Sequence, residues 1–380
     1  MALKKVLVTG GAGYIGSHLV DGLIGRGYEV TVFDSLVPQV HRSGTWPSYA
    51  NARATYVRGD VRDRAAFEPL ILAADAVVHF AAAVSIGQSM YEIDRYVDVN
   101  TRGTALLLDI LVNHKHNVQK VIVASSIGVF GEGAYRCRTH GAVAPGTRPA
   151  EQLAAQQWEQ RCPQCGEPVV SIPTSEDKPL YRDSIYSMTK YHQEEMVLLI
   201  GKTYGIPAVA PRFFNVYGPR QSLSNPYAGV AAIFLSRLLN DREPVVFEDG
   251  GQLRDFVSIH DVVQCLTLML EKPGADFLPV NVGSGETVTI LEIARTLARL
   301  LGTSIEPRVT NQGRRFDIRH NTADITRARQ TLGYEPTVSL ADGMAELIDW
   351  ARNSPDGAVD MFEKAMSELE QKGLLVQPTV

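Results

Sequence analysis

Tyr186 and Lys190 have the side chains and the spacing of an acid–base pair. They are four residues apart in a segment, 184–203, whose pattern predicts a helix with Ser184 as its N-cap, so both side chains lie on one helix face. An ammonium close to a phenol favours the ionised phenol, whose ordinary pKa is about 10. Ser126 ends an apolar run, and its hydroxyl can donate to a developing alkoxide. Together these residues predict proton transfer at a substrate hydroxyl.

Such a pair is common by chance, so its meaning depends on the elements around it. Gly10, Gly13 and Gly16 follow an apolar run and open an amphipathic segment, which is the context of a dinucleotide-binding turn. Gly10 permits the tight turn, Gly13 lets the backbone approach a pyrophosphate, and Gly16 lets the helix pack closely. The next apolar run ends at Asp34, whose carboxylate would accept from a ribose 2′-hydroxyl and repel a 2′-phosphate. This segment predicts NAD rather than NADP.

Further apolar runs alternate with helical segments along the first 205 residues. Residues 54–57, 76–82 and 121–126 read as buried strands, which predicts a parallel sheet covered on both faces. Ligands bind at the carboxyl ends of such strands, and five candidates fall there: Gly10, Asp34, Asp60, Phe80 and Ser126. The expected fold class is α/β, with a Rossmann-type doubly wound parallel sheet.

A segment at about residues 134–176 carries four residues with metal-ligand spacing. Cys137-x-x-His140 and Cys162-x-x-Cys165 are separated by 21 residues, which suits a tetrahedral zinc site of three thiolates and one imidazole. The alternative is a set of unrelated loop cysteines or a disulfide, but a reducing cytoplasm favours zinc. Four ligands leave no open position, so we expect a structural, zinc-knuckle-like insertion. Because it lies between two of the catalytic candidates in sequence, we expect it to border the substrate pocket.

Composition narrows the class of protein. The chain has 380 residues, with 37 Lys and Arg against 42 Asp and Glu for a net charge of −5, which argues against a nucleic-acid partner. No stretch approaches the roughly 20 apolar residues of a membrane span. A strand-like run begins at Val6, which leaves no room for a signal peptide, and four cysteines make no secreted disulfide framework. We therefore expect a cytoplasmic protein without a membrane partner.

The motifs together resemble the extended short-chain dehydrogenase/reductase family, in its nucleotide-sugar epimerase and dehydratase branch. The similar segments run in order over about residues 4–352, apart from the insertion. They are Thr9 to Gly16, Gly59-Asp60-Val61, His79 to Ala82, Asn100 to Thr104, Ser125-Ser126, Tyr186-x-x-x-Lys190, Arg212 to Arg220, Arg254 to Val257, Asn281-Val282-Gly283 and Leu332 to Pro336.

The resemblance implies a tightly held NAD and assigns residues to it by position. Ser126, Tyr186 and Lys190 would be the catalytic triad. The cofactor-binding residues would be Gly10, Gly13, Tyr14, Ile15, Gly16, Asp34, Asp60, Val61, Phe80, Ala81, Ala82, Asn100, Tyr186, Lys190 and Phe214. The substrate-binding residues would be Ser85, Ser126, Asn215, Phe247, Arg254, Arg314 and Asp317, with Arg254 on the diphosphate. The sequence departs from the family at Phe316, where a glycine is usual.

Two features of the sequence distinguish among the reactions of this branch. Its dehydratases carry an Asp-Glu pair after the catalytic Ser or Thr, whereas Ile127-Gly128 follows Ser126 here. Its net reductases use NADP(H), against which Asp34 argues. Redox-neutral 4-epimerisation fits best: oxidation at C4 to a 4-keto sugar, then return of the hydride to the other face. The insertion and Asp317-Ile318-Arg319-His320 are similar to those of bacterial dTDP-L-rhamnose 4-epimerases, which favours that substrate.

Alternatives stay open at this point. They are a UDP-glucose or UDP-glucuronate 4-epimerase, a 4-keto reductase on the same fold, and a non-catalytic dinucleotide-sensing or RNA-associated protein. The expected organisation is an NAD-binding domain at 1–205, a smaller α/β lobe for the sugar nucleotide at 206–352, partly interleaved with the first domain, and a helical extension at 353–380. The resemblance also implies a homodimer.

Overall fold

A parallel sheet runs through the first domain and takes two strands from the second half of the chain. The computed structural model describes residues 3–225, 227, 229–354 and 357–376. The order of the path is β3 (Thr55–Arg58), β2 (Glu29–Asp34), β1 (Lys5–Thr9), β4 (Ala76–His79), β5 (Lys120–Val123), β10 (Ala208–Phe213) and β15 (Leu278–Val282), and the short β6 (Ser125–Ser126) pairs with β10. The strand order reverses at β1, whose neighbours are β2 and β4, as in a dinucleotide-binding fold.

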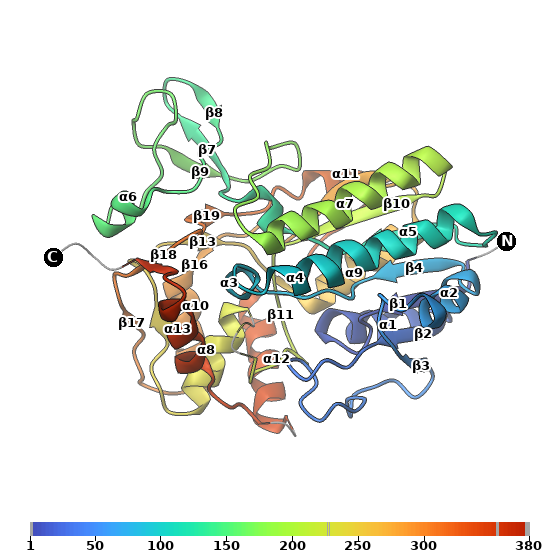
Figure 1. Cartoon of the computed structure of the whole chain (residues 1–380). Helices are drawn as coiled ribbons and strands as arrows, with labels where there is room; N and C mark the ends of the chain where they lie inside the picture. The colour runs from blue at the N-terminus through green and yellow to red at the C-terminus, as the bar shows by residue number, and fades with distance from the viewer. Residues whose placement is uncertain (1–2, 226, 228, 355–356, 377–380) are drawn as a thin grey trace.

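Helices cover both faces of this sheet (Figure 1). One face carries α2 (Arg64–Leu72), α5 (Gly103–Asn113) and α7 (Ile185–Tyr204), and the other carries α1 (Tyr14–Gly25), α9 (Ile259–Glu271) and α11 (Thr326–Leu332). Side chains such as Val77 and Leu107 are buried on the first face, and Val78 and Leu266 on the second. Each buried side chain of this size contributes about 1.5–3 kcal/mol, so the two layers hold the strand ends in fixed positions.

Short elements link the sheet to the site. They are α3 (Ile86–Ser89), α4 (Ile93–Tyr96), the π-helix η1 (Val97–Arg102) and the 3₁₀ helix η2 (Ile127–Phe130). Helix α7 begins as the sequence predicts, because Ser184 Oγ accepts a hydrogen bond from Ser187 N at 3.1 Å. It ends at Gly205, whose φ of +69° suits a glycine C-cap.

The second half of the chain packs around its own apolar core. Its helices are α8 (Val230–Leu239), α10 (Ile290–Leu301) and α12 (Leu340–Asn353). Its strands pair as β11 (Asn215–Tyr217) with β14 (Phe256–Ser258), β12 (Val245–Val246) with β17 (Arg308–Val309), and β13 (Leu253–Arg254) with both β16 (Val288–Thr289) and β19 (His320–Asn321).

The C-terminal extension packs back onto the molecule. Helix α13 (Phe362–Gln371) precedes β20 (Leu375–Val376), which pairs antiparallel with β18 (Gly313–Arg314). Glu368 on α13 accepts hydrogen bonds from the hydroxyls of Tyr91 and Tyr227, so the extension joins both halves of the chain. Residues 377–380 of the predicted extension lie outside the described part of the chain.

The insertion projects from one end of the molecule (Figure 1). It consists of β7 (Ala134–Cys137) between β8 (Gly141–Val143) and β9 (Val170–Ile172), with α6 (Ala150–Ala154) in the loop. Trp158 packs with Leu153 and Val376 rather than on the cysteines. The small sheet buries Tyr135 completely, so the insertion has a local core.

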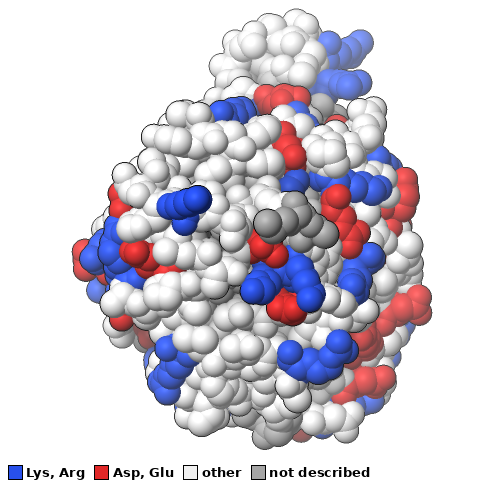
Figure 2. Space-filling view, turned by 90° about the vertical axis from the view of Figure 1, so that its right-hand side faces the viewer, with Lys and Arg blue, Asp and Glu red and all other residues white. Residues whose placement is uncertain are grey.

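The surface is mixed in charge. On the face in Figure 2, Lys and Arg side chains are interspersed with Asp and Glu side chains. Among the residues described above, none of the helices combines the length and the apolar character needed to cross a lipid bilayer.

Candidate active site

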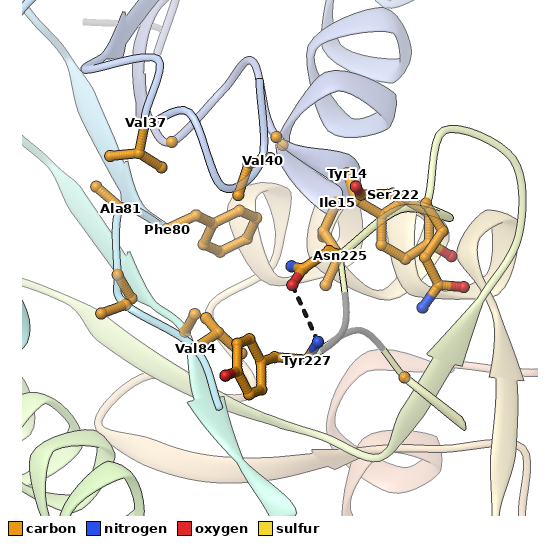
Figure 3. A pocket seen from close by; sticks show the side chains of 18 of the residues that line it. Tyr14, Ile15, Val37, Val40, Phe80, Ala81, Val84, Ser222, Asn225 and Tyr227 are labelled. Carbon is orange, nitrogen blue, oxygen red and sulfur yellow. Dashed lines mark hydrogen bonds between the residues drawn. The ribbon is translucent and has the colours of Figure 1, made fainter. Parts of the chain in front are cut away.

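A cavity of about 710 Å³ opens at the carboxyl ends of the central strands. Every predicted cofactor residue except Asn100 lines it, as do Ser126 and Asn215. Figure 3 shows Val37, Val40 and Phe80 on one side of the cavity and Tyr14 and Asn225 on another. Residues more than 200 positions apart therefore meet around a single space at the switch point of the sheet.

The glycine turn closes against the sheet at the floor of the cavity. Gly10 has a φ of +68°, and a Cβ there would lie 2.8 Å from Ala81 N. A Cβ on Gly16 would lie 2.4 Å from Gly10 O, so the helix can start this close to the turn only without a side chain. The free N-terminus of α1 then faces the cavity, where it favours an anion.

Two acids border the same space. Asp34 lines the cavity while its carboxylate accepts from Leu36 N at 2.9 Å and Ala12 N at 3.1 Å. Asp60 is held by Arg62 through two bonds of 2.8 and 2.6 Å, and these hydrogen bonds lower the pKa of Asp60. Both carboxylates are therefore fixed in place as acceptors.

Four residues of the cavity wall carry buried polar atoms that have no partner within the described residues. These atoms are Tyr14 Oη, Asn215 Oδ1, Arg220 Nη1 and Gln221 Oε1. Buried polar groups are hydrogen-bonded in nearly all proteins, so such atoms indicate a missing polar ligand. Together with the glycine turn and Asp34, they fit a bound dinucleotide.

The three catalytic candidates converge at one side of the cavity. Ser126 and Tyr186 are joined by a hydrogen bond that lowers the pKa of the phenol, but burial raises it by more. The Lys190 ammonium instead donates to Ala124 O at 3.0 Å and to Gln193 Oε1 at 2.9 Å, which leaves one of its three donors for a ligand. Burial lowers the pKa of Lys190 to about 7. Burial therefore raises the pKa of Tyr186, and the expected lowering of this pKa by Lys190 is not found.

Asn100 supports the site without lining it. Its side chain accepts from Ala83 N at 2.7 Å and donates to Ala83 O and Thr189 Oγ1, both at 3.0 Å. These bonds tie the segment after β4 to α7, the helix that carries Tyr186 and Lys190. Ser85 likewise stays outside the cavity wall, where it caps α3 by accepting from Gln88 N.

The other predicted substrate residues form a separate cluster. Arg314 donates to Asp317 at 2.7 Å and lies over the ring of Phe247 at 4.5 Å. Arg254 lies 3.9 Å from Asp317 and donates to the carbonyls of Arg319 and Ile318 at 3.0 and 2.5 Å. None of the four lines the 710 Å³ cavity. We name Phe247, Arg254, Arg314 and Asp317 the nucleotide cluster, after the role that the resemblance implies.

The backbone conformation at residue 316 shows why a glycine is usual at this position. Its φ is +63°, the left-handed region that a side chain enters at a cost of roughly 1–2 kcal/mol. A glycine would adopt this conformation freely, and here a phenylalanine holds it between Arg314 and Asp317.

The four metal candidates come together as the spacing predicts. Cys137 Sγ lies 3.6 Å from His140 Nδ1 and 3.7 Å from Cys165 Sγ, and Cys162 Sγ lies 3.5 Å from His140 Nδ1. All four ligand atoms lie within 4.8 Å of one another, and the cysteines are free thiols. Zinc–sulfur bonds of about 2.3 Å give a tetrahedron of about this size. The insertion does not line the cavity, but it contacts the nucleotide cluster, because Arg148 donates to Asp317 O at 3.2 Å.

Several residues of the site carried no recognisable sequence signal. The stretch after β2 supplies Val37 and Val40, and a loop near residue 225 supplies Ser222, Asn225 and Tyr227. In that loop Tyr227 N donates to Asn225 Oδ1 at 3.0 Å (Figure 3). Both stretches are irregular, so neither periodicity nor a motif marks them.

Comparison with known proteins gives a consistent result. A sequence profile described as the NAD dependent epimerase/dehydratase family matches residues 6–155 and 162–283. A dTDP-L-rhamnose 4-epimerase from Burkholderia thailandensis is 35% identical over 357 residues, which cover 93% of this chain and 96% of that protein.

Solved structures agree with the sequence comparison. UDP-glucose 4-epimerase from Thermotoga maritima, solved with UDP-glucose, has a TM-score of 0.76 at 31% identity, covering 92% of this chain and 99% of that one. UDP-glucuronic acid 4-epimerase from Bacillus cereus, solved with UDP-glucuronic acid and NAD, has a TM-score of 0.74 at 28% identity, with the same two coverages.

Proposed function

The chain belongs to the NAD-dependent epimerase/dehydratase family, and on that premise we propose that it inverts C4 of a nucleotide sugar, with dTDP-L-rhamnose as its substrate. One observation carries the reaction type. Ser126, Tyr186 and Lys190 meet at the wall of the cavity, and Ile127-Gly128 follows Ser126 without the acid pair of a dehydratase. The relative from Burkholderia thailandensis supports the choice of sugar nucleotide.

Each residue of the triad has a distinct task. Tyr186 takes the proton of the 4-hydroxyl and later returns it. Ser126 donates a hydrogen bond to the same oxygen while it is an alkoxide or a ketone. Lys190 directs its remaining donor at a ribose hydroxyl, held in place by its bonds to Ala124 and Gln193. Bound NAD supplies a reversible hydride acceptor, so no net oxidation occurs.

Proton NMR without added cofactor tests the proposal. Purified protein is incubated with dTDP-L-rhamnose, UDP-glucose or UDP-glucuronate in separate tubes. We expect a second sugar nucleotide from dTDP-L-rhamnose, in which the large coupling between H3 and H4 has become small. Conversion of only a UDP sugar would move the substrate to the alternative epimerases. If no sugar nucleotide is converted in any of the three tubes until NAD(P)H is added, the protein is a 4-keto reductase and the proposed mechanism is wrong.

We further propose that Cys137, His140, Cys162 and Cys165 hold one structural zinc ion. The support is the tetrahedral size of the cluster and the absence of a disulfide among the described cysteines. Four protein ligands leave no open coordination position, so zinc would hold the insertion together and take no part in the reaction.

A homodimer through α7 and η1 is also proposed. Met188 and Leu199 on α7 and Val97 on η1 are exposed apolar side chains, and Thr101 meets His192 where the two helices touch. A second copy of the chain would cover this stripe. Light scattering on a size-exclusion column should give twice the mass of the 41.6 kDa chain, and Leu199→Arg should reduce it toward the monomer. A wild-type monomer would refute the dimer.

A further inference from the structure

We propose that Arg148 and Glu159, both on the insertion, are positioning residues for the nucleotide end of the substrate site. The inference rests on the proposed function, because that function gives the nucleotide cluster its role. The insertion lies outside the cavity, yet the side chains of Arg148 and Glu159 end among the residues that flank this cluster.

Arg148 reaches the stretch that carries Phe247. Its guanidinium makes two parallel bonds to Glu248, of 2.7 and 3.0 Å, and the side chains of both residues are buried. It also donates to Asp317 O at 3.2 Å. One side chain of the insertion thus joins the chain beside Phe247 to the chain at Asp317, two members of the nucleotide cluster.

Glu248 needs such a partner for two reasons. Its carboxylate is fully buried, and a buried carboxylate without a counter-charge is strongly unfavourable. Its backbone also has a φ of +53°, a conformation that non-glycine residues keep only when their surroundings enforce it. The paired bonds from Arg148 hold this strained residue, and with it the position of Phe247.

Glu159 reaches the chain that follows Asp317. It accepts from Arg319 at 2.5 and 3.0 Å and from His320 Nε2 at 2.9 Å. His320 Nδ1 accepts from Leu253 N at 3.0 Å, so Nε2 carries the proton that is donated to Glu159. Because Leu253 precedes Arg254, this path fixes the backbone that presents the guanidinium expected on the diphosphate.

Arg319 connects the contacts of Arg148 with those of Glu159. Its side chain is almost fully buried and also binds Glu248 at 3.0 Å and Asp249 at 2.7 Å. Its backbone N–H and that of His320 donate to Glu132, two residues before β7 of the insertion. The charges alternate around the network. Removing Arg148 therefore takes one of two cations from the buried Glu248, and removing Glu159 takes one of three carboxylates from the buried Arg319.

Arg148 and Glu159 both lie between His140 and Cys162 in the chain. The metal cluster joins the two ends of that loop, which places the two positioning residues inside a segment closed at its base. The insertion therefore acts on the substrate site through two side chains and without lining the cavity.

Calorimetric titration of the NAD-loaded protein with dTDP and with UDP tests the inference. We expect Arg148→Met to raise the Kd of the preferred nucleotide at least tenfold, while bound NAD stays at the wild-type level. Glu159→Ala, at a half-exposed position with little folding risk, should raise it about threefold to tenfold. Where turnover is measured, KM should rise by a similar factor and kcat should stay within about twofold.

Two controls separate positioning from loss of structure. Arg138→Met removes an exposed arginine from the same insertion and should leave the Kd unchanged. Arg148→Lys keeps the charge but loses the paired bonds, so we expect a smaller rise in the Kd of the nucleotide. This variant provides the test if Arg148→Met fails to fold. An unchanged Kd in folded Arg148 and Glu159 variants, or loss of NAD together with the nucleotide, would overturn the inference.

The same titration distinguishes this failure from failure of the proposed function. A wild-type protein that binds dTDP or UDP through Arg148 but converts no nucleotide sugar would refute the epimerase and support the positioning role. A wild-type protein that binds neither nucleotide would overturn the positioning role as well.

Discussion

Lys190 and Gln193 are joined by a 2.9 Å hydrogen bond between the ammonium Nζ and the amide Oε1, one turn apart on α7. The amide cannot turn over freely, because its Nε2 donates to Thr104 Oγ1 at 2.8 Å. Thr104 in turn donates to Asn100 O and lies 3.1 Å from His79 Nε2. A buried chain of hydrogen bonds therefore holds Lys190, the lysine of the proposed catalytic triad, on the side away from the cavity.

Replacement of Gln193 should damage turnover while the fold survives. Gln193→Leu removes an acceptor from Lys190 and a donor from Thr104, and a buried unpaired group costs about 1–3 kcal/mol. We expect kcat to fall roughly tenfold, since about 1.4 kcal/mol corresponds to a factor of ten. Gln119→Leu makes the same change at an exposed position and should leave kcat unchanged. Equal activity of the two variants would show that Gln193 does not position Lys190.

Tyr186→Phe should abolish epimerisation and leave NAD in place. Loss of a general base typically reduces a rate by about 10²–10⁴-fold, whereas the ring and its contact with Tyr96 are kept. Turnover is followed by NMR, and bound NAD is measured after denaturation. Tyr204→Phe, at an exposed position at the end of the same helix, is the matched control. Surviving activity in the Tyr186 variant would require another base.

Lys190→Met should change how stability depends on pH. Burial lowers the pKa of Lys190 to about 7, below its ordinary value of about 10.4. Between those pH values the unfolded chain binds more protons than the folded one, so the wild type gains stability as the pH rises. The variant lacks this gain.

In NAD-free protein, Lys190→Met should therefore be more stable than wild type at pH 7 and below. The difference should shrink toward pH 10, by about 1.4 kcal/mol for each unit of pKa shift. Urea unfolding at a series of pH values measures it. A difference that stays constant from pH 6.5 to pH 10 would mean that Lys190 is not shifted in the folded protein.

Zinc should be present at one equivalent per chain in protein never exposed to a chelator. Cys162→Ser should remove it and loosen the insertion, because metal binding and local folding are coupled. Elemental analysis gives the zinc content, and limited proteolysis reports the loosening. Cys265→Ser, on a cysteine buried in α9, should keep its zinc. Wild-type protein with well under one equivalent would contradict the assignment.

Phe316 offers a matched pair of variants for backbone strain. Phe316→Gly and Phe316→Ala both remove the ring, but only glycine accepts the φ of +63° without cost. The glycine variant should be more stable than the alanine variant by about 1 kcal/mol. Thermal unfolding of the two proteins side by side checks this, and equal stabilities would place residue 316 in a different backbone conformation.

The sheet, and the meeting of Ser126, Tyr186 and Lys190 at one cavity, could be predicted because their signals are local. Apolar runs, glycine spacing and the four-residue step from Tyr186 to Lys190 all act within one element. The cysteine spacing likewise predicts the cluster that the structure contains. The pairing of Arg148 with Glu248 could not be predicted, since the two residues are 100 positions apart and lie in irregular segments.

Two expectations from the sequence differ from the structure, and both depend on three-dimensional surroundings that the sequence does not show. Spacing alone suggested that Lys190 would ionise Tyr186, but a buried phenol is harder to ionise, and the ammonium is turned toward Ala124 and Gln193. The insertion was expected beside the cavity because of its place in the sequence. In space its residues Arg148 and Glu159 lie against residues 317–320, a contact that chain order does not reveal.

The pairing of β20 with β18 has a consequence for the order in which the protein matures. All strands of the main sheet lie upstream of residue 283, so the dinucleotide-binding half can assemble while the rest is still being translated. Arg314 lies in β18, and Arg315 N donates to Leu374 O at 3.0 Å, so the partner strand for this part of the nucleotide cluster is translated after every described strand of the main sheet. A nascent chain would thus be able to bind its cofactor before the nucleotide cluster is complete.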